Sequence, residues 1–146
     1  LRLLTGREPL DVACLVERVT TLRTEDSFVA SIRLGGDALP AVLAAVAGSR
    51  ATDSRAGSIR VVGRDAQIVA DHVRGEVALL RGRGIELEER VADVPTVEAL
   101  LRSFPDVASG RVEPVADVRD GAAAVAVADA CYRSAESGRH VAVRTE

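Results

Sequence analysis

The chain has 146 residues, enough for one domain with its own core, and its net charge is −3. The apolar share is 47% but the aromatic share only 2%, so Ala, Val, Leu and Ile must build that core. All 19 basic residues are Arg, which excludes a Schiff-base lysine, a lysine acid or base, and the lysine of a phosphate-binding P-loop.

The pattern in the first part of the chain predicts the end of a helix followed by strands. Residues 1–6, "LRLLTG", are typical of a last helical turn, with Gly6 at the left-handed cap position and Pro9 preventing continuation. Residues 10–22 are rich in β-branched side chains that roughly alternate with others, and residues 26–34 alternate more cleanly. One face of this second strand carries Phe28, Ala30, Ile32 and Leu34, and the other carries Val29, Ser31 and Arg33.

The segment "ALPAVLAAVAG", residues 38–48, is ambiguous from composition alone. Its alanines favour a helix, but Pro40 lies inside it and the tight-turn sequence "GGD" at 35–37 comes directly before it. We therefore predict a strand here. A polar loop, "SRATDSRAG", follows at 49–57.

The residue pattern in the middle of the chain predicts pairs of strands joined by turns, followed by a helix. The glycines Gly82 and Gly84 mark one of the turns. From residue 95 the apolar spacing changes to three and four residues, which predicts a helix over 95–104. The four predicted strands are 58–63, 64–71, 76–82 and 85–91.

A longer helix and a short strand close the chain. Asp117 is a good N-cap residue, and Asp120 lies in the first turn, where the helix dipole favours an acid. The body is 121–137, Gly138 ends it, and residues 139–143, "RHVAV", alternate as a final strand.

Because the predicted strands come first and the predicted helices mostly later, the sequence predicts an α+β fold. This fold would be an open, largely antiparallel mixed β-sheet with helices packed on one face. No repeat or low-complexity linker divides the chain, so residues 1–146 are interpreted as a single domain. Because the chain opens on Leu1 in what reads as the middle of a helix, we expect it to be cut from something longer.

The stretch 129–143, "DACYRSAESGRHVAV", carries the densest set of reactive side chains. Cys131 falls within an apolar stripe, and His140 lies beyond the helix cap, so we interpret Cys131 as a small buried residue and prefer a helix end to a catalytic Cys–His pair. Asp129 and Arg133 form an i,i+4 pair on the same helix. The predicted stripe is Ala124, Val127, Ala128, Cys131 and Ala135.

Three other candidates are weak for similar reasons. The segment "GRGIEL" at 82–87 begins like a dinucleotide fingerprint, but Leu87 replaces the third Gly and strands are predicted on both sides, so a hairpin turn is favoured. His72 has no neighbouring metal ligands and is interpreted as a strand or turn residue. Glu86 and Glu88 are best explained by an exposed or subunit-facing strand. No catalytic, cofactor-binding or metal-ligating residue is predicted in this chain.

The loop between Ser49 and Arg55 is the remaining polar candidate. Polar loops on rigid scaffolds often line ligand sites, but a solvated surface loop fits its composition equally well.

Composition also limits the partners and the compartment. The basic residues alternate with acids and few aromatics are present to stack on bases, so nucleic-acid binding is not expected. The apolar runs are shorter than the roughly 20 residues of a membrane span. Cys14 and Cys131 are too few for a disulfide framework and wrongly spaced for zinc, which indicates a reducing, cytoplasmic environment.

Several phrases, taken in order, resemble a known family. They are "LRLLTGREPLDVACLVERV" at 1–19, "EDSFVASIRLGGDALPAVLAA" at 25–45, "SIRVVGRDAQIVAD" at 58–71 and, above all, "DGAAAVAVADACYRSAESGRHVAV" at 120–143. Together they resemble the C-terminal domain of the glucose-fructose oxidoreductase / inositol dehydrogenase / rhizopine catabolism (Gfo/Idh/MocA) oxidoreductases.

The resemblance implies a two-domain enzyme. An N-terminal Rossmann domain would hold NAD or NADP, with a Glu-Lys-Pro segment there and a His-x-x-Asp segment just before the second domain carrying the chemistry. This chain contains neither motif, so the resemblance implies that it binds no cofactor and is inert alone.

For this chain the resemblance implies a substrate-binding and oligomerisation role. The helix-covered side of the sheet would face inward, and the other face would pair with a second copy. The small-molecule substrate would be a sugar, polyol or related hydroxy compound, and Arg50, Asp53 and Arg55 are candidate contacts to it. The alternative from another class is a freestanding dimerisation or ligand-binding module without catalytic activity. A self-contained Cys–His hydrolase is a third hypothesis.

Overall fold

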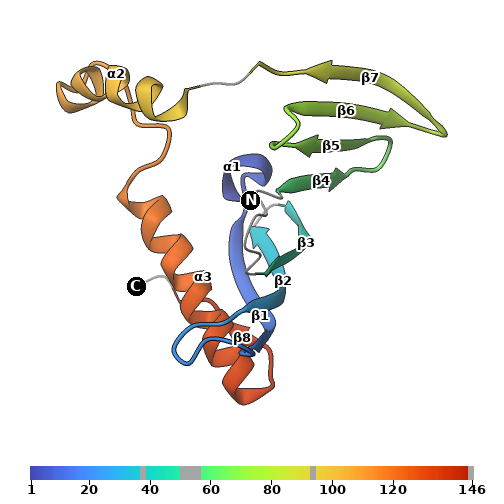
Figure 1. The fold of residues 1–146 in the computed structure, drawn as a ribbon, viewed down its shortest axis with the longest axis vertical. Helices are drawn as coiled ribbons and strands as arrows, with labels where there is room; N and C mark the ends of the chain where they lie inside the picture. Colours follow the sequence, from blue (N-terminus) through green and yellow to red (C-terminus); the bar gives the residue numbers. More distant parts are fainter. Residues whose placement is uncertain (37–38, 50–56, 93–94, 145–146) are drawn as a thin grey trace. The chain divides into compact units, whose positions relative to one another are not determined.

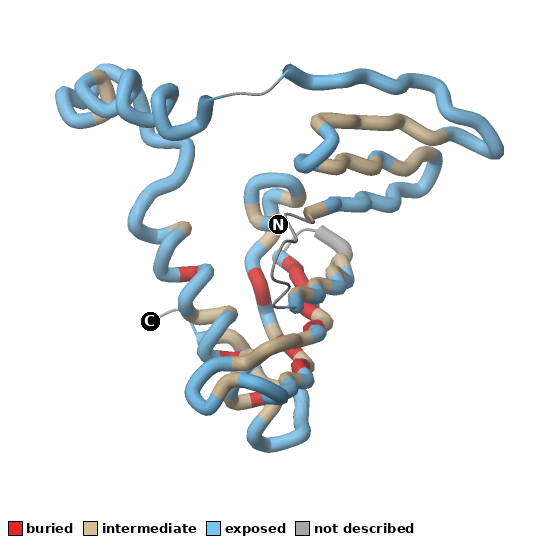
Figure 2. Tube along the Cα trace, in the orientation of Figure 1, coloured by how far each residue is buried: buried red, intermediate tan, exposed pale blue. Residues whose placement is uncertain are grey.

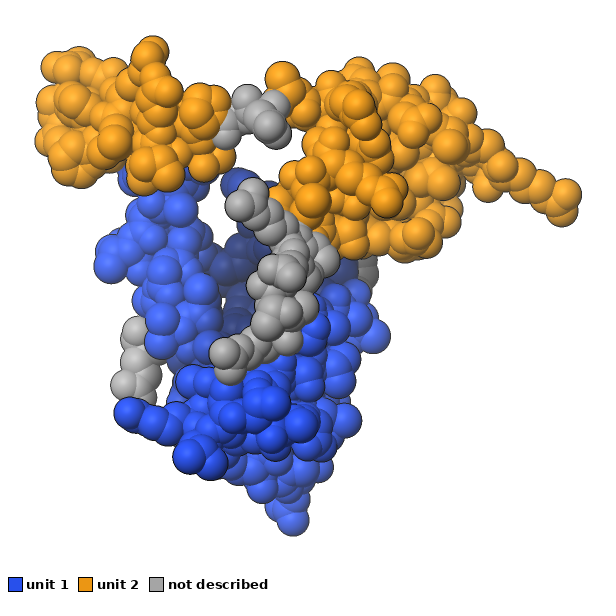
Figure 3. Space-filling model, viewed as in Figure 1, with its two compact units in different colours: residues 1–51, 114–146 blue, residues 52–113 orange. Residues whose placement is uncertain are grey.

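The computed structural model describes residues 1–36, 39–49, 57–92 and 95–144. The chain forms two compact units (Figure 3). Unit 1 comprises Leu1–Ala51 and Pro114–Glu146, and unit 2 comprises Thr52–Glu113. Each unit contains an antiparallel sheet of four strands and at least one helix. The α+β fold is therefore confirmed, with the described strands divided between two sheets.

Unit 1 is a sheet with a long helix on one face (Figure 1). Its strand order is β3-β2-β1-β8, and each neighbouring pair is antiparallel. The helix α3 packs against β1 and β8. The elements of this unit are α1 (Arg2–Thr5), β1 (Glu8–Glu17), β2 (Ser27–Gly36), β3 (Leu39–Ser49), α3 (Val118–Ser137) and β8 (Val141–Ala142).

The buried residues lie on β1, β2 and α3, where Figure 2 shows them in red. The alternation predicted for residues 26–34 is confirmed: Ala30, Ile32 and Leu34 are 1–5% exposed, whereas Val29 on the other face is 49% exposed. Such alternation is expected of a strand with one face on the core. The strand prediction for "ALPAVLAAVAG" is also confirmed, since β3 pairs along β2.

The ends of the two helices follow the predicted caps. Gly6 has φ 62° and its N–H donates to the Arg2 carbonyl, which ends α1. At α3, the Asp117 side chain accepts from the backbone N–H of Asp120 at 3.0 Å, while the Asp120 side chain accepts from the N–H of Asp117 at 3.0 Å. This reciprocal capping box begins the helix, and Gly138 at φ 63° ends it.

The predicted apolar stripe on α3 is correct at Val127 and Cys131, which pack against the core, and wrong at Ala124 and Ala128. Ala124 and Ala128 are exposed, and the buried positions are instead Ala123, Ala130 and Ser134. The helix is nearly all Ala and Val on several faces, so apolar spacing alone does not distinguish the face that packs on the sheet. Several strand boundaries also differ from those predicted. The largest differences are at β1, which ends at Glu17, at the strand predicted for 64–71, which begins at Gln67, and at the final ladder, which contains only Val141–Ala142.

Unit 2 is a meander with the strand order β4-β5-β6-β7, followed by one helix. None of its described residues is buried. The predicted apolar spacing of the helix is present, but its side chains at Val97, Leu100, Leu101 and Phe104 are 64–69% exposed. The elements are β4 (Ser58–Val62), β5 (Gln67–Asp71), β6 (Glu76–Arg81), β7 (Gly84–Arg90) and α2 (Thr96–Ala108).

In the part of the chain that the structure describes, no helix combines the length and the apolar character needed to cross a bilayer.

Candidate functional site

The predicted substrate contacts Arg50, Asp53 and Arg55 lie outside the described residues. The candidate site is therefore built from unit 1, where a cavity of about 650 Å³ opens on the helix-covered side of the sheet. Ile32 and Leu34 of β2 and Val127 of α3 give it an apolar floor. A volume of this size is typical of small-molecule sites.

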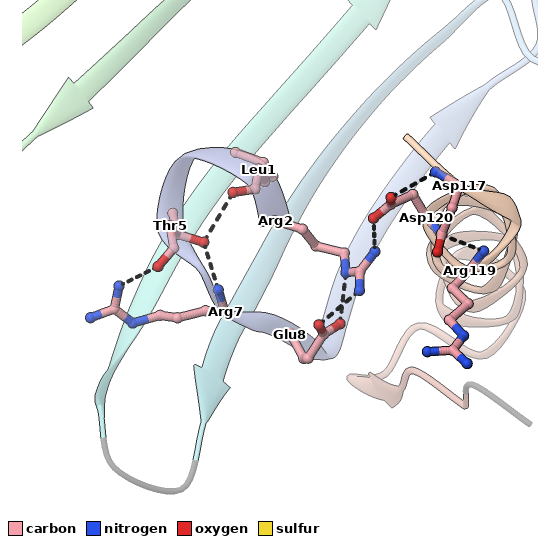
Figure 4. A network of polar contacts seen from close by, with 8 residues as sticks. All are labelled: Leu1, Arg2, Thr5, Arg7, Glu8, Asp117, Arg119 and Asp120. Atoms are coloured by element: carbon pink, nitrogen blue, oxygen red, sulfur yellow. Dashed lines mark hydrogen bonds and ion pairs between the residues drawn. The ribbon is translucent and has the colours of Figure 1, made fainter. Parts of the chain in front are cut away.

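A charged network lies along this cavity (Figure 4). Arg2 at the start of α1 forms a two-pronged contact with Glu8, through Nε to Oε2 at 2.8 Å and Nη2 to Oε1 at 2.9 Å. Its Nη1 also donates to Asp120 at the start of α3. One guanidinium therefore connects the beginning of β1 with the first turn of α3.

Hydrogen bonds in this network shift the pKa values of three of its residues, Arg2, Glu8 and Asp117. The hydrogen bond from Arg2 holds the pKa of Glu8 below its usual range, and the Glu8 carboxylate raises the pKa of Arg2. The pKa of Asp117 is lowered, chiefly by the backbone N–H of Asp120. Groups held in their charged forms are poor proton donors and acceptors near neutral pH.

The cavity is consequently suited to binding more than to proton transfer. A guanidinium offers hydrogen-bond donors and the carboxylates offer acceptors, which together match the hydroxyl groups of a polar ligand. The apolar floor would contact the carbon skeleton of such a ligand. Among the described residues, no group of three or more His, Cys, Asp or Glu is placed to hold a metal ion.

The Cys131 and His140 side chains interact with different partners. The Cys131 thiol lies beside Cys14, and burial raises the pKa of Cys131 to about 11. The His140 Nδ1 lies 3.4 Å from Asp11 Oδ1. A raised thiol pKa is the opposite of what a catalytic cysteine requires at neutral pH, so this geometry favours the helix-end interpretation. The predicted Asp129–Arg133 pair is confirmed at 2.8 Å.

The other sequence candidates take the structural roles that were favoured for them. Residues Gly82 and Arg83 connect β6 to β7 as a hairpin, so this glycine segment is not followed by the helix that a dinucleotide site needs. His72 lies in a turn, with Nδ1 2.8 Å from the Gly57 carbonyl oxygen. Glu86 and Glu88 lie on β7, which is exposed along its whole length.

Ser134 is the residue whose role the sequence did not reveal. Its Oγ accepts the N–H of Cys14 at 2.9 Å and donates to the Arg139 carbonyl at 2.7 Å. It is 1% exposed, the one buried polar side chain found among the described residues. A serine in the last turns of a helix is common, and only its position on the packed face distinguishes this one.

Unit 1 is thus an antiparallel sheet with the helix α3 on one face and a polar-rimmed cavity on that same face. The family model described as "Oxidoreductase family, C-terminal alpha/beta domain" matches residues 2–143. The chain belongs to this Gfo/Idh/MocA oxidoreductase family, as its C-terminal domain.

Solved structures share the fold at low sequence identity. UDP-N-acetylglucosamine 3-dehydrogenase GnnA from Acidithiobacillus ferrooxidans is 21% identical, with a TM-score of 0.80 over 93% of this chain and 43% of its own. The WlbA dehydrogenase from Bordetella pertussis, in complex with NADH and UDP-GlcNAcA, is 18% identical, with a TM-score of 0.67 over 95% and 40%.

A third similar structure is levoglucosan dehydrogenase in complex with NADH and levoglucosan, 16% identical, with a TM-score of 0.73 over 95% of this chain and 46% of its own. The chain thus spans less than half the length of these three proteins. No match was found among curated protein sequences.

Proposed function

We propose that this chain is the substrate-facing and subunit-pairing domain of an NAD- or NADP-dependent oxidoreductase that acts on a sugar, polyol or related hydroxy compound. The observation that carries this proposal is the charged cavity on the helix-covered side of the sheet, in a chain of this family. Residues 1–146 would act as one C-terminal domain beside an N-terminal Rossmann domain.

The Rossmann domain would hold the cofactor. In the described residues the glycine-rich turn at Gly82 and Gly84 joins two strands, so it does not present a helix N-terminus to a pyrophosphate. Nicotinamide, when bound, accepts or donates the hydride. This chain would orient the hydroxy compound through hydrogen bonds from Arg2 and to Glu8, and would keep water away with the apolar floor of the cavity.

The names of the similar structures support the substrate class. They include a UDP-N-acetylglucosamine dehydrogenase and a levoglucosan dehydrogenase, both of which act on carbohydrate-type compounds. The loop residues Arg50, Asp53 and Arg55 stay candidate substrate contacts. We also propose that the enzyme is cytoplasmic, since Cys14 and Cys131 are both free thiols.

The face of the unit 1 sheet opposite α3 supports pairing with a second copy. Its central row places Leu15, Val29 and Ala47 side by side across three strands, and Leu15 and Val29 are 69% and 49% exposed. The next row contains Ala13, Ser31 and Ala45. Small and apolar side chains in rows suit face-to-face packing of two sheets.

The proposal is tested with the full-length protein and a panel of UDP-sugars, anhydrosugars, aldoses and polyols, with NAD and NADP. We expect at least one hydroxy compound to be oxidised with reduction of the nicotinamide. The variant Arg2→Gln should raise KM by about 10-fold, a loss of roughly 1.4 kcal/mol of binding. The matched control is Arg102→Gln on the exposed face of α2, which should leave KM unchanged.

Two results would contradict the proposal. One is the absence of turnover across the panel with both cofactors. The other is a full-length protein that binds a ligand or dimerises normally and has no Rossmann domain, which would favour the freestanding binding module.

A further inference from the structure

Two cysteines that lie far apart in the sequence come together inside unit 1. Cys14 lies on the core-facing side of β1, and Cys131 lies on the face of α3 that packs against it. Both side chains line one cavity of about 260 Å³. They are the only cysteines of the chain, and both are free thiols.

A hydrogen bond connects the backbone of Cys14 with the helix that carries Cys131. The Cys14 N–H donates to Ser134 Oγ at 2.9 Å, and Ser134 follows Cys131 by one helical turn. The neighbouring Cys14 thiol also contributes, after burial, to the raised pKa of Cys131. The strand and the helix are thus held in contact where the two cysteines line the same cavity.

We propose that Cys14 and Cys131 are a redox modification site that forms a reversible disulfide between β1 and α3. In a reducing environment the pair stays a dithiol, and a disulfide oxidant such as oxidised glutathione converts it. Disulfides of this kind in reducing compartments are transient and serve redox sensing more often than structure.

The chemistry proceeds in two exchange steps. The Cys131 thiolate attacks one sulfur of oxidised glutathione, which forms a mixed disulfide and releases one glutathione thiolate. The Cys14 thiol then loses its proton, attacks the Cys131 sulfur and releases the second glutathione. Two protein thiols are oxidised, and one glutathione disulfide is reduced to two glutathiones.

The surroundings determine the order and the rate of these steps. Cys131 is half-buried whereas Cys14 is 5% exposed, so Cys131 is the thiol that an oxidant meets first. Because burial disfavours the thiolate, exchange should be slow at neutral pH and accelerate as the pH rises. The cavity beside the pair gives the oxidant its approach.

The inference is tested on the purified protein by incubation with oxidised glutathione at neutral and mildly alkaline pH. Free thiols are titrated after denaturation, and the products are identified by intact mass and by peptide mapping without reduction. We expect both thiols to disappear together, with loss of two hydrogen masses and one cross-linked peptide pair containing Cys14 and Cys131. Dithiothreitol should restore both thiols, and the oxidised form should melt at a higher temperature.

A variant pair controls for reagent activity and for folding. In Cys131→Ser, Cys14 should resist oxidation, and in the double variant Cys131→Ser, Val125→Cys the exposed new thiol should yield only the mixed disulfide with glutathione. The inference is overturned if the native thiols stay reduced while that exposed thiol reacts. It is equally overturned if the native protein yields only stable glutathione adducts or disulfides between two chains.

Discussion

The hydroxyl group of Ser134 accepts a backbone hydrogen bond from β1 that a neighbouring strand would otherwise accept. The strand β8 pairs with β1 at Asp11 and Val12, and Val143 N–H donates to the Leu10 carbonyl at 2.9 Å. Beyond this ladder the N–H of Cys14 has no strand partner on that side, and Ser134 Oγ accepts it. Since the O–H of the same hydroxyl group donates to the Arg139 carbonyl, one side chain satisfies two backbone groups.

Ser134→Ala should lower the free energy of unfolding by about 1–3 kcal/mol, because it leaves a buried N–H and a carbonyl without their partner. Urea denaturation followed by circular dichroism measures the change. The control is Ser137→Ala, whose hydroxyl is exposed and bonds only to carbonyls of its own helix. Equal stability of the native protein and Ser134→Ala would contradict this role.

The roles of some single residues could be predicted from the sequence, and the roles of others could not. Asp117 and Gly138 are recognisable because capping chemistry is local and depends on a few neighbouring positions. The Arg2–Asp120 contact and the Cys14–Cys131 pair join residues from opposite ends of the chain, so no local pattern indicates them. Their geometry comes from the packing of α1 and α3 on the sheet.

Among the elements, the connection between β1 and β2 is organised by one carboxylate. Asp26 accepts hydrogen bonds from the backbone N–H groups of Val19 and Thr20, both at 2.6 Å, and from that of Thr21 at 3.1 Å. The Thr20 hydroxyl donates to it at 2.7 Å. These donors, the Thr20 N–H foremost, hold the pKa of Asp26 far below its usual value.

The lowered pKa of Asp26 makes the stability of the fold depend on pH. A carboxyl group whose pKa is lower in the folded state stabilises the fold above its unfolded pKa, about 4, and this contribution is lost as the pH falls towards the folded value. Asp26→Asn should therefore lower the thermal midpoint at pH 7, and the difference from the native protein should shrink as the pH falls below about 4. Thermal melts across this range measure it.

The exposed Glu136→Gln on α3 is the control for Asp26→Asn and should leave the melting curves unchanged. A difference between Asp26→Asn and the native protein that stays constant from pH 7 to acid would contradict the assignment.

Most of the helices and strands could be predicted from the sequence, because the spacing of apolar residues is a local pattern. The strands of both sheets alternate or are bounded by turn residues, and Pro40 with the preceding tight turn correctly outweighed the helix preference of alanine in β3. The packed face of α3 was predicted only in part, at Val127 and Cys131, because apolar residues surround much of the helix. The division of the strands into two sheets was likewise missed, since pairing is a long-range property.

At the scale of the whole molecule, the exposed face of the unit 1 sheet predicts an oligomer. Val29→Arg places a charge in its central row beside Leu15 and Ala47, and should reduce the mass of the full-length protein in solution to that of a monomer. Sedimentation velocity measures the mass. Val125→Arg, at an exposed position on α3, is the control that should keep the native mass. A native mass for Val29→Arg would show that this face does not pair.

We propose that this domain presents a surface to the substrate, whereas the nicotinamide is held by the rest of the full-length protein. Titration of this chain alone with NADH and NADPH, followed by the fluorescence of the nicotinamide, tests the claim most directly. We expect no saturable change in fluorescence with this chain alone, and saturable binding by the full-length protein under the same conditions. Saturable micromolar binding by this chain alone would contradict it.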